Sequence, residues 1–115
     1  MIARVWRAGL NPARLEAYRH FEQTQCLPMF FRQPGFLGGL FLREAADRAV
    51  SLTLWEDGGA VEALESSPSY RKTTRELVEE ALLAGEPSVE VWEVQSGELR
   101  VEALLRVLGG LSRPS

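Results

Sequence analysis

A short segment near the middle of the chain combines an aromatic ring with hydroxyl groups. In SLTLWED, residues 51–57, the side chains of an extended strand point alternately to opposite faces. Ser51, Thr53 and Trp55 therefore share one face, whereas Leu52 and Leu54 share the other. An indole in this setting fits core packing, a contact with a second copy of the chain, or the wall of a pocket.

Two further side chains are candidates for chemistry. His20 is the single histidine, the residue type whose ordinary pKa lies closest to neutrality, so it is the candidate general base. Glu16 lies four residues earlier on the expected helix, a spacing that equally fits an exposed His–Glu pair. Tyr70 begins another apolar helical stripe, which continues through Thr74, Leu77, Val78 and Ala81. Its hydroxyl could donate a hydrogen bond or mark the boundary of the core.

The chain offers little material for a metal or a nucleotide cofactor. Cys26 is the single cysteine, so it cannot form an internal disulfide, and with one histidine it cannot complete the usual four-ligand zinc site. The glycine pairs at 38–39 and 58–59 lack the Lys-Ser/Thr of a phosphate loop. We therefore expect no metal and no cofactor, and we interpret Cys26 as a small buried residue rather than a nucleophile.

The amino-acid composition indicates the class of protein and excludes some classes of partner. The chain has 115 residues, 45% of them apolar and 25% charged, as in one ordinary globular domain. Its net charge of −3 argues against nucleic acid or an anionic membrane as the main partner. No apolar run reaches the length of a signal peptide or a membrane-spanning helix, so a cytoplasmic location is expected.

Periodicity and turn residues predict the order of elements. Asn11-Pro12 and Ser67-Pro68 are expected helix starts, because Asn or Ser can cap the first turn and Pro loses no hydrogen bond there. We expect Pro28 to bend or restart the first helix and Gly85 to end the other. The remaining predicted elements are strands at residues 2–8, 36–44 and 88–95, a strand that follows the connection AADR and ends at Trp55, and a short helix near residues 60–64.

Residues 97–115 form a C-terminal extension beyond a domain that spans residues 1–96. Val101, Leu104, Leu105 and Leu108 have helical spacing and Gly109 follows them, which favours a helix at about residues 98–108. A hairpin through Ser96-Gly97 is the alternative.

The order β-α-β-β-α-β indicates an α+β domain of the ferredoxin-like, split βαβ type, with both helices on one face of a four-stranded antiparallel sheet. The second and fourth strands carry apolar residues on both sides, so the bare face of the sheet should also be covered. A second copy packed sheet to sheet is the expected cover.

Two segments carry a resemblance to a known family. PGFLGGLFLR, residues 34–43, and the more specific WEDGGAVEALESSPSYR, residues 55–71, resemble the antibiotic biosynthesis monooxygenase family. The resemblance covers about residues 1–95. It implies a homodimeric α+β barrel with a pocket between sheet and helices in each subunit. Relatives include cofactor-free oxygenases of aromatic polyketide quinols, haem-degrading enzymes and proteins without an established reaction.

The resemblance also implies roles for particular residues. Trp55 matches the tryptophan that lines the family's pocket, and Ser51 stands where the polyketide oxygenases have Asn. The haem-degrading relatives use an Asn on the first strand and a His where this chain has Tyr70. Strand one holds Arg4 and Trp6 instead, which makes haem ligation by His doubtful, although tyrosine can ligate haem.

We therefore expect a cofactor-independent monooxygenase for a small aromatic substrate, a quinol or polyketide-like compound. Trp55, Tyr70 and His20 are the expected catalytic residues, and Ser51 and Thr53 complete the pocket with Trp55 and Tyr70. Trp55 would stack on the ring, Tyr70 and Ser51 would donate hydrogen bonds, and His20 would be the base. The alternatives are a non-catalytic ligand-binding or structural dimer and, third, a haem-binding or haem-degrading protein.

Overall fold

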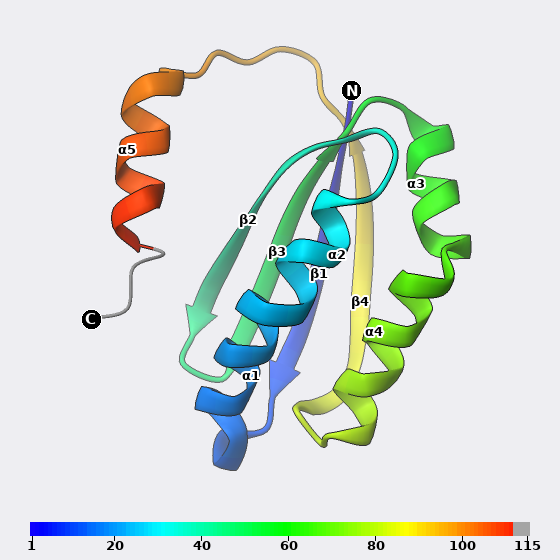
Figure 1. Cartoon of the computed structure of the whole chain (residues 1–115), viewed down its shortest axis with the longest axis vertical. Coiled ribbons are helices and arrows are strands. Elements are labelled where there is room, and N and C mark those ends of the chain that lie inside the picture. Colours follow the sequence, from blue (N-terminus) through cyan, green and yellow to red (C-terminus); the bar gives the residue numbers. More distant parts are fainter. Residues whose placement is uncertain (112–115) are drawn as a thin grey trace.

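A computed structural model describes residues 1–111 as a sheet covered on one face by helices (Figure 1). The strands and helices follow one another in the predicted order, with a further helix at the C-terminal end. In chain order they are β1 (Ile2–Leu10), η1 (Pro12–Arg14), α1 (Leu15–Phe21), η2 (Glu22–Cys26), α2 (Leu27–Phe31), β2 (Phe36–Ala45), β3 (Arg48–Trp55), α3 (Gly58–Ser66), α4 (Pro68–Glu79), β4 (Leu83–Glu93) and α5 (Val101–Leu111).

The sheet has four antiparallel strands in the order β2-β3-β1-β4. Its two central strands, β1 and β3, are the first strands of two βαβ units, which is the split βαβ arrangement and confirms the predicted α+β, ferredoxin-like fold. The register of β2 against β3 shifts between Phe36 and Gly38, next to the glycine pair at residues 38–39.

Alternation along the strands divides the sheet into two unlike faces. Arg4 pairs with Thr53 and Trp6 with Ser51, and all four are buried beneath the helices. Trp55 belongs to this same covered face. The polar residues predicted to share a face therefore lie inside the domain.

The first helical segment is continuous in space but changes its winding. Asn11 Oδ1 accepts a hydrogen bond from the Ala13 N–H, as predicted for the helix start. Between α1 and α2 the chain widens into the π-helical turn η2, where the Leu27 N–H donates to the Glu22 carbonyl five residues earlier. The wide turn immediately precedes Pro28, whose ring would clash with a carbonyl in regular α-helix. Pro28 thus changes the helix without ending it.

The helix predicted to start at Ser67-Pro68, α4, ends earlier than the predicted terminator Gly85. α4 ends at Glu79, and Ala81 adopts a positive φ of 54° in the turn that follows. Gly85, predicted as the helix terminator, lies in β4, also with positive φ. Val78, predicted to lie in the apolar stripe, is 69% exposed, because Thr73 and Leu77 supply the buried side of the helix.

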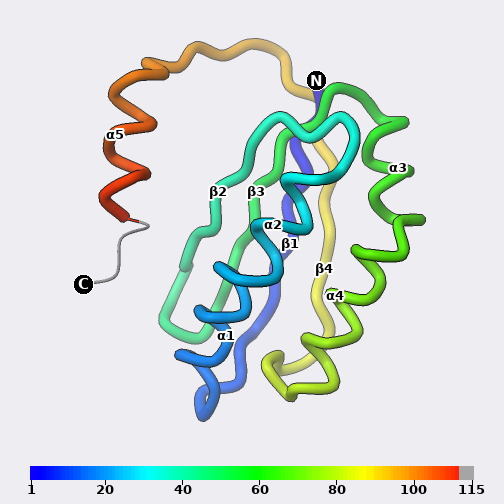
Figure 2. The backbone as a smooth tube through the Cα atoms, viewed as in Figure 1, coloured from blue at the N-terminus to red at the C-terminus, as the bar shows by residue number. Residues whose placement is uncertain are grey.

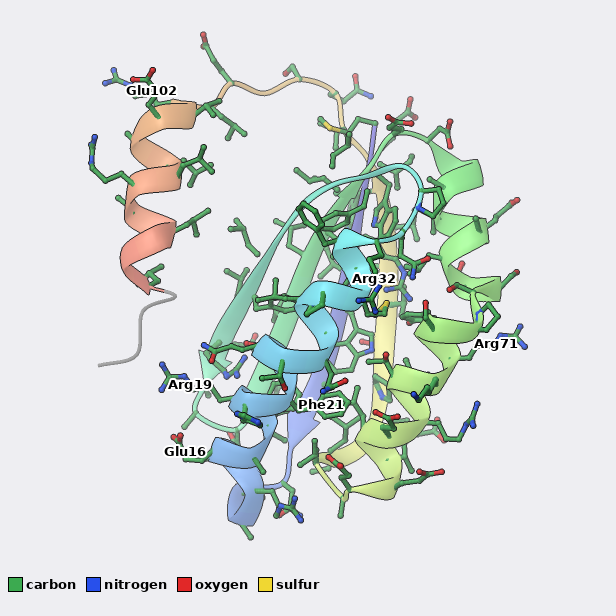
Figure 3. The ribbon with its side chains drawn as sticks, viewed as in Figure 1. Glu16, Arg19, Phe21, Arg32, Arg71 and Glu102 are labelled. Carbon is green, nitrogen blue, oxygen red and sulfur yellow. The ribbon has the colours of Figure 1, made fainter. Side chains whose placement is uncertain are left out.

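Side chains on the first helix show the same division between buried and exposed sides (Figure 3). Glu16 and Arg19 project from α1 into solvent, whereas Phe21 is buried between α1 and α4. The helical layer is therefore amphipathic, as its periodicity predicted.

Among residues 1–111 no helix covers the opposite face of the sheet, which carries apolar side chains. Leu42 and Trp92 are exposed there, Trp92 by 58%, and Val50, Leu52 and Leu54 are half-buried. An uncovered apolar surface of this kind marks an interaction site.

The C-terminal extension leaves the sheet beside the N-terminus (Figure 2), where the Val94 N–H donates to the Met1 carbonyl at 3.0 Å. It then runs to α5, which stands apart from the sheet and its helices (Figure 1). α5 begins three residues later than predicted. Several apolar side chains of α5 are exposed: Val101, Leu105, Val107 and Leu111. Within residues 1–111 no helix is long and apolar enough to cross a membrane.

Gly35 provides a test of the turn that leads into β2. Its φ is +80°, and a Cβ atom there would lie 2.5 Å from the Ala60 Cβ. Gly35→Ala should therefore lower the free energy of unfolding by about 1–3 kcal/mol, measured by urea denaturation. Gly58→Ala is the control, because a Cβ at Gly58 meets open space. Equal stabilities of the two variants would contradict this account of the turn.

Candidate functional site

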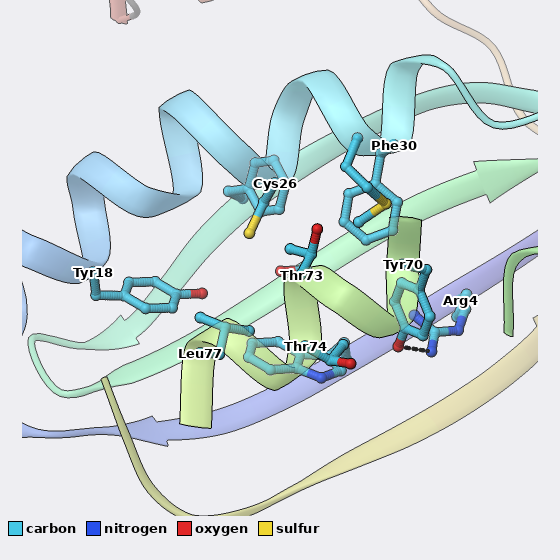
Figure 4. Close-up of a pocket in the computed structure, with 12 residues that line it drawn as sticks. Arg4, Tyr18, Cys26, Phe30, Tyr70, Thr73, Thr74 and Leu77 are labelled. Carbon is cyan, nitrogen blue, oxygen red and sulfur yellow. Dashed lines mark hydrogen bonds between the residues drawn. The ribbon is translucent and has the colours of Figure 1, made fainter. Parts of the chain in front are cut away.

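A small cavity of about 30 Å³ lies between the covered face of the sheet and the helices (Figure 4). This volume admits a molecule the size of water or dioxygen. The lining side chains come from β1, β2, β3, the α1–α2 segment and α4. They are Arg4, Trp6, Tyr18, Cys26, Met29, Phe30, Phe41, Ser51, Tyr70, Thr73, Thr74 and Leu77.

Arg4 is the central polar group of the cavity, and the sequence analysis did not select it. Its side chain projects from the central strand β1 and is 2% exposed. One guanidinium nitrogen, Nη2, donates to the Tyr70 hydroxyl at 2.7 Å, and the guanidinium carbon lies 5.2 Å from the centre of the Tyr70 ring. Arg4 Nε is buried without a hydrogen-bond partner.

Arg4 also lacks a counter-charge. Within residues 1–111 the ion pairs join other arginines and the lysine to glutamates, and none involves Arg4. Arginine keeps its positive charge at physiological pH, and a buried charge without a partner is costly. The sequence shows Arg4 as a charged residue at a position of β1 that points inward. The burial of Arg4 could not be predicted in the same way, because it depends on the helices that cover this face of the sheet.

Tyr70 reaches the cavity because of the way α4 begins. Ser67 caps this helix and Pro68 occupies its first turn, as predicted, which places Tyr70 in the same turn. Its ring packs at a tilt against that of Phe30, another lining residue, with the ring centres 6.3 Å apart. Because its oxygen accepts from Arg4, the hydroxyl hydrogen is left to donate to a ligand.

Trp55 lies behind the cavity rather than on its wall. It is fully buried, and its Nε1–H donates to the Thr53 hydroxyl at 2.8 Å. Its ring packs edge-on against Phe30 and Phe36, with centroid distances of 6.3 and 5.4 Å. Trp55 therefore braces Phe30, which does line the cavity.

The two hydroxyls that share a face with Trp55 have different settings. Thr53 accepts from Trp55 and donates to the Arg4 carbonyl at 3.4 Å, and it does not line the cavity. Ser51 lines the cavity and makes no side-chain hydrogen bond within residues 1–111. The Ser51 hydroxyl is thus free to bind a ligand, whereas the Thr53 hydroxyl is occupied by its hydrogen bonds to Trp55 and to the Arg4 carbonyl.

His20 lies outside this cavity. It is exposed on α1, in a surface groove that Glu76 and Glu80 of α4 also line. The structure therefore brings Ser51 and Tyr70 together with Arg4, places Trp55 one layer behind, and does not bring His20 to them.

A second buried cluster adjoins the cavity at the π-helical turn. Glu22 is buried and pairs with Arg43 at 3.1 Å, and the Arg43 guanidinium lies 4.9 Å from the centre of the Tyr18 ring. Burial, and then the neighbouring Glu22 carboxylate, raise the pKa of the Tyr18 hydroxyl far above its ordinary value. The same two causes raise the pKa of the Cys26 thiol to about 12. Both groups are therefore neutral where they line the cavity at physiological pH.

Within residues 1–111 no three His, Cys, Asp or Glu side chains gather in a way that could hold a metal ion. Of the residues that line the cavity, Arg4 alone is charged at neutral pH, since the other ionisable side chains there are two tyrosines and the cysteine.

The raised pKa of Cys26 predicts an unreactive thiol. At pH 8 a thiol with a pKa of about 12 is ionised to a fraction on the order of 10⁻⁴, and the thiolate is the reactive form. Labelling of native protein by a disulfide reagent should be at least about a hundredfold slower than labelling in guanidinium chloride, where the thiol has its ordinary pKa. The release of coloured thiolate measures both rates. Similar rates would show that Cys26 is accessible and ionised in the folded chain.

No protein-family model matches this chain, and no curated protein sequence matches it. Solved structures do match. A protein of unknown function, NE2512, from Nitrosomonas europaea superposes with a TM-score of 0.73 at 17% identity, over 85% of this chain and 92% of that one. Another N. europaea protein, provisionally named as an antibiotic biosynthesis monooxygenase, gives 0.71 at 13% identity, over 84% and 100%.

SnoaB, a cofactor-independent oxygenase from Streptomyces nogalater, is also similar, with a TM-score of 0.63 at 21% identity over 84% of this chain and 94% of SnoaB. Identities this low establish shared architecture and leave function open. The resemblance predicted from residues 34–43 and 55–71 is thus confirmed by structure: this chain has the ferredoxin-like α+β fold of the antibiotic biosynthesis monooxygenase proteins.

Proposed function

We propose that this chain is a homodimeric, cofactor-independent monooxygenase of the antibiotic biosynthesis monooxygenase family, acting on a small aromatic quinol or polyketide-like substrate. The observation that carries the proposal is the cavity between the sheet and the helices, where Ser51 and Tyr70 offer hydroxyls among aromatic side chains. The similarity of the fold to SnoaB, whose name states such an activity, supports the same reaction class.

The reaction needs no electrons from outside the substrate. An aromatic anion passes electrons to dioxygen, one oxygen atom is retained as a new carbonyl, and the other leaves as water with the two hydrogens that the substrate loses. The protein's part is to exclude water and to stabilise the negative charge that develops on oxygen. A cavity of about 30 Å³ accommodates dioxygen, and the aromatic substrate needs side chains of the cavity wall to move aside.

Three of the predicted residues, Tyr70, Ser51 and Trp55, have roles that their positions allow. The Tyr70 hydroxyl donates to the developing oxyanion, and the Arg4 guanidinium strengthens it as a donor through their hydrogen bond. Ser51 donates from the floor of the cavity. Trp55 acts through Phe30, whose ring it holds in place, and is thus a positioning residue.

One observation favours the second candidate, a dimer that binds an aromatic ligand without turning it over. No carboxylate or histidine lines the cavity, so a general base is absent from its walls. A binder of this kind shows affinity for quinols but consumes no oxygen.

Oxygen consumption with a panel of anthracyclic and naphthalenic quinols tests the proposal. Wild-type protein should consume oxygen, and Tyr70→Phe should lower the rate by at least about tenfold, because one oxyanion donor is lost. Trp55→Phe should also lower it, through the loss of the support for Phe30. His20→Asn is the matched control and should leave the rate unchanged, since His20 lies outside the cavity. Binding without oxygen consumption would establish the non-catalytic alternative.

The dimer is proposed to form through the open face of the sheet. Leu52 lies at the centre of that face, paired with Val5 on one side and Leu40 on the other. Leu52→Glu should convert the dimer to a monomer in sedimentation equilibrium, because it places a charge in an apolar interface.

Val78→Glu is the control for this test, since Val78 is exposed on α4 away from the open face. It should leave the dimer intact. A wild-type protein that sediments as a monomer at micromolar concentration would overturn the proposed assembly.

A further inference from the structure

Arg4 places a positive charge in the cavity wall, and no acidic side chain among residues 1–111 forms an ion pair with it. Arg4 is almost completely buried, and its Nε has no partner. Most buried arginines are paired, because desolvation of the guanidinium is otherwise uncompensated. An orphan donor on a buried cation at a cavity wall indicates that the missing partner is an anion from outside the chain.

The other lining groups make the cavity selective for the sign of charge. Tyr18 and Cys26 face it from the α1–α2 segment (Figure 4), and both are neutral. Thr73 and Thr74 face it from α4 and donate their hydroxyl hydrogens to backbone carbonyls of their own helix. The remaining lining side chains, apart from Ser51 and Tyr70, are apolar or aromatic. The low dielectric of such walls strengthens the attraction between Arg4 and an anion.

We infer that Arg4 and Tyr70 form a binding site for an aromatic phenolate or enolate, and that the substrate is held in this cavity as its anion. This inference rests on the proposed function for the identity of the site, and it deepens that function by naming the two residues that hold the substrate anion.

The site also accounts for the absence of a base from the cavity walls. A neighbouring cation lowers the pKa of a phenol, so part of the neutral substrate loses its proton to water on binding. The phenolate oxygen then accepts from Arg4 and from the hydroxyl hydrogen of Tyr70, which the Arg4–Tyr70 hydrogen bond leaves free. Arg4 takes the place of a base by stabilising the product of the proton transfer.

The test uses 4-nitrophenol, whose phenolate absorbs visible light and whose neutral form does not. Absorbance is titrated against pH with excess wild-type protein. The pKa of the bound probe should be at least one unit below that of the free probe, a tenfold shift in its ionisation. 4-Nitroanisole, which has no proton to lose, should bind at least tenfold more weakly than the phenolate.

Variants assign the effect to Arg4. Arg4→Met should abolish the shift, and Arg4→Lys, which keeps a charge, should retain part of it. Arg7→Met is the matched control, because Arg7 lies on the same strand, faces the opposite side and pairs with Glu90. It should titrate as wild type. Circular dichroism checks folding, and if Arg4→Met does not fold, the wild-type comparison of the two probes and the Arg4→Lys titration decide the question.

The outcomes separate this inference from the proposed function. A lowered probe pKa without oxygen consumption by any quinol supports the anion site and overturns the oxygenase. Oxygen consumption that Arg4→Met leaves at the wild-type rate supports the oxygenase and overturns the anion site. Equal affinity for the two probes, or no binding of either at millimolar concentration, also overturns the anion site.

Discussion

Successive side chains of a β-strand point to opposite faces of its sheet, and in this protein that alternation separates the functional residues from the surface for assembly. On β1 and β3 the inward set includes Arg4, Trp6, Ser51, Thr53 and Trp55, whereas the outward set is apolar apart from Arg7 and Arg48. A shift of register by one residue would bury the leucines and expose the tryptophans. The helices, the cavity and the open face all follow from this arrangement.

The helical layer completes the cavity because its two segments approach the sheet differently. The π-helical turn before Pro28 keeps the first segment continuous, so that both Tyr18 and Met29 are buried against the sheet. α4 starts at Ser67-Pro68 and brings Tyr70 within hydrogen-bond distance of Arg4. A buried guanidinium without a counter-ion is unfavourable for folding, and proteins accept such a cost mainly where a ligand uses it.

Much of the fold could be predicted from the chain alone. The capping residues Asn11 and Ser67, the alternation in SLTLWED and the order of elements together led to the observed sheet. The errors lay where local signals compete. Gly85 resembled a helix terminator, but Ala81 takes the positive φ and the glycine lies in β4. Val78 fitted the apolar stripe, yet the sheet lies beneath Thr73 and Leu77.

The candidate site was predicted less completely than the fold. Periodicity placed Ser51, Thr53 and Trp55 on one face, and residue types singled out Tyr70 and His20, but a sequence does not specify which side chains meet across 66 positions. The contact between Arg4 and Tyr70, the position of Trp55 behind Phe30, and the exposure of His20 on α1 depend on how the helices lie on the sheet. Local signals were enough to predict the elements and their faces, because helix and strand propensity, capping and alternation act between residues close together in the chain. The chain alone did not reveal which polar groups are desolvated and which find hydrogen-bond partners, because burial depends on packing between segments far apart in the chain.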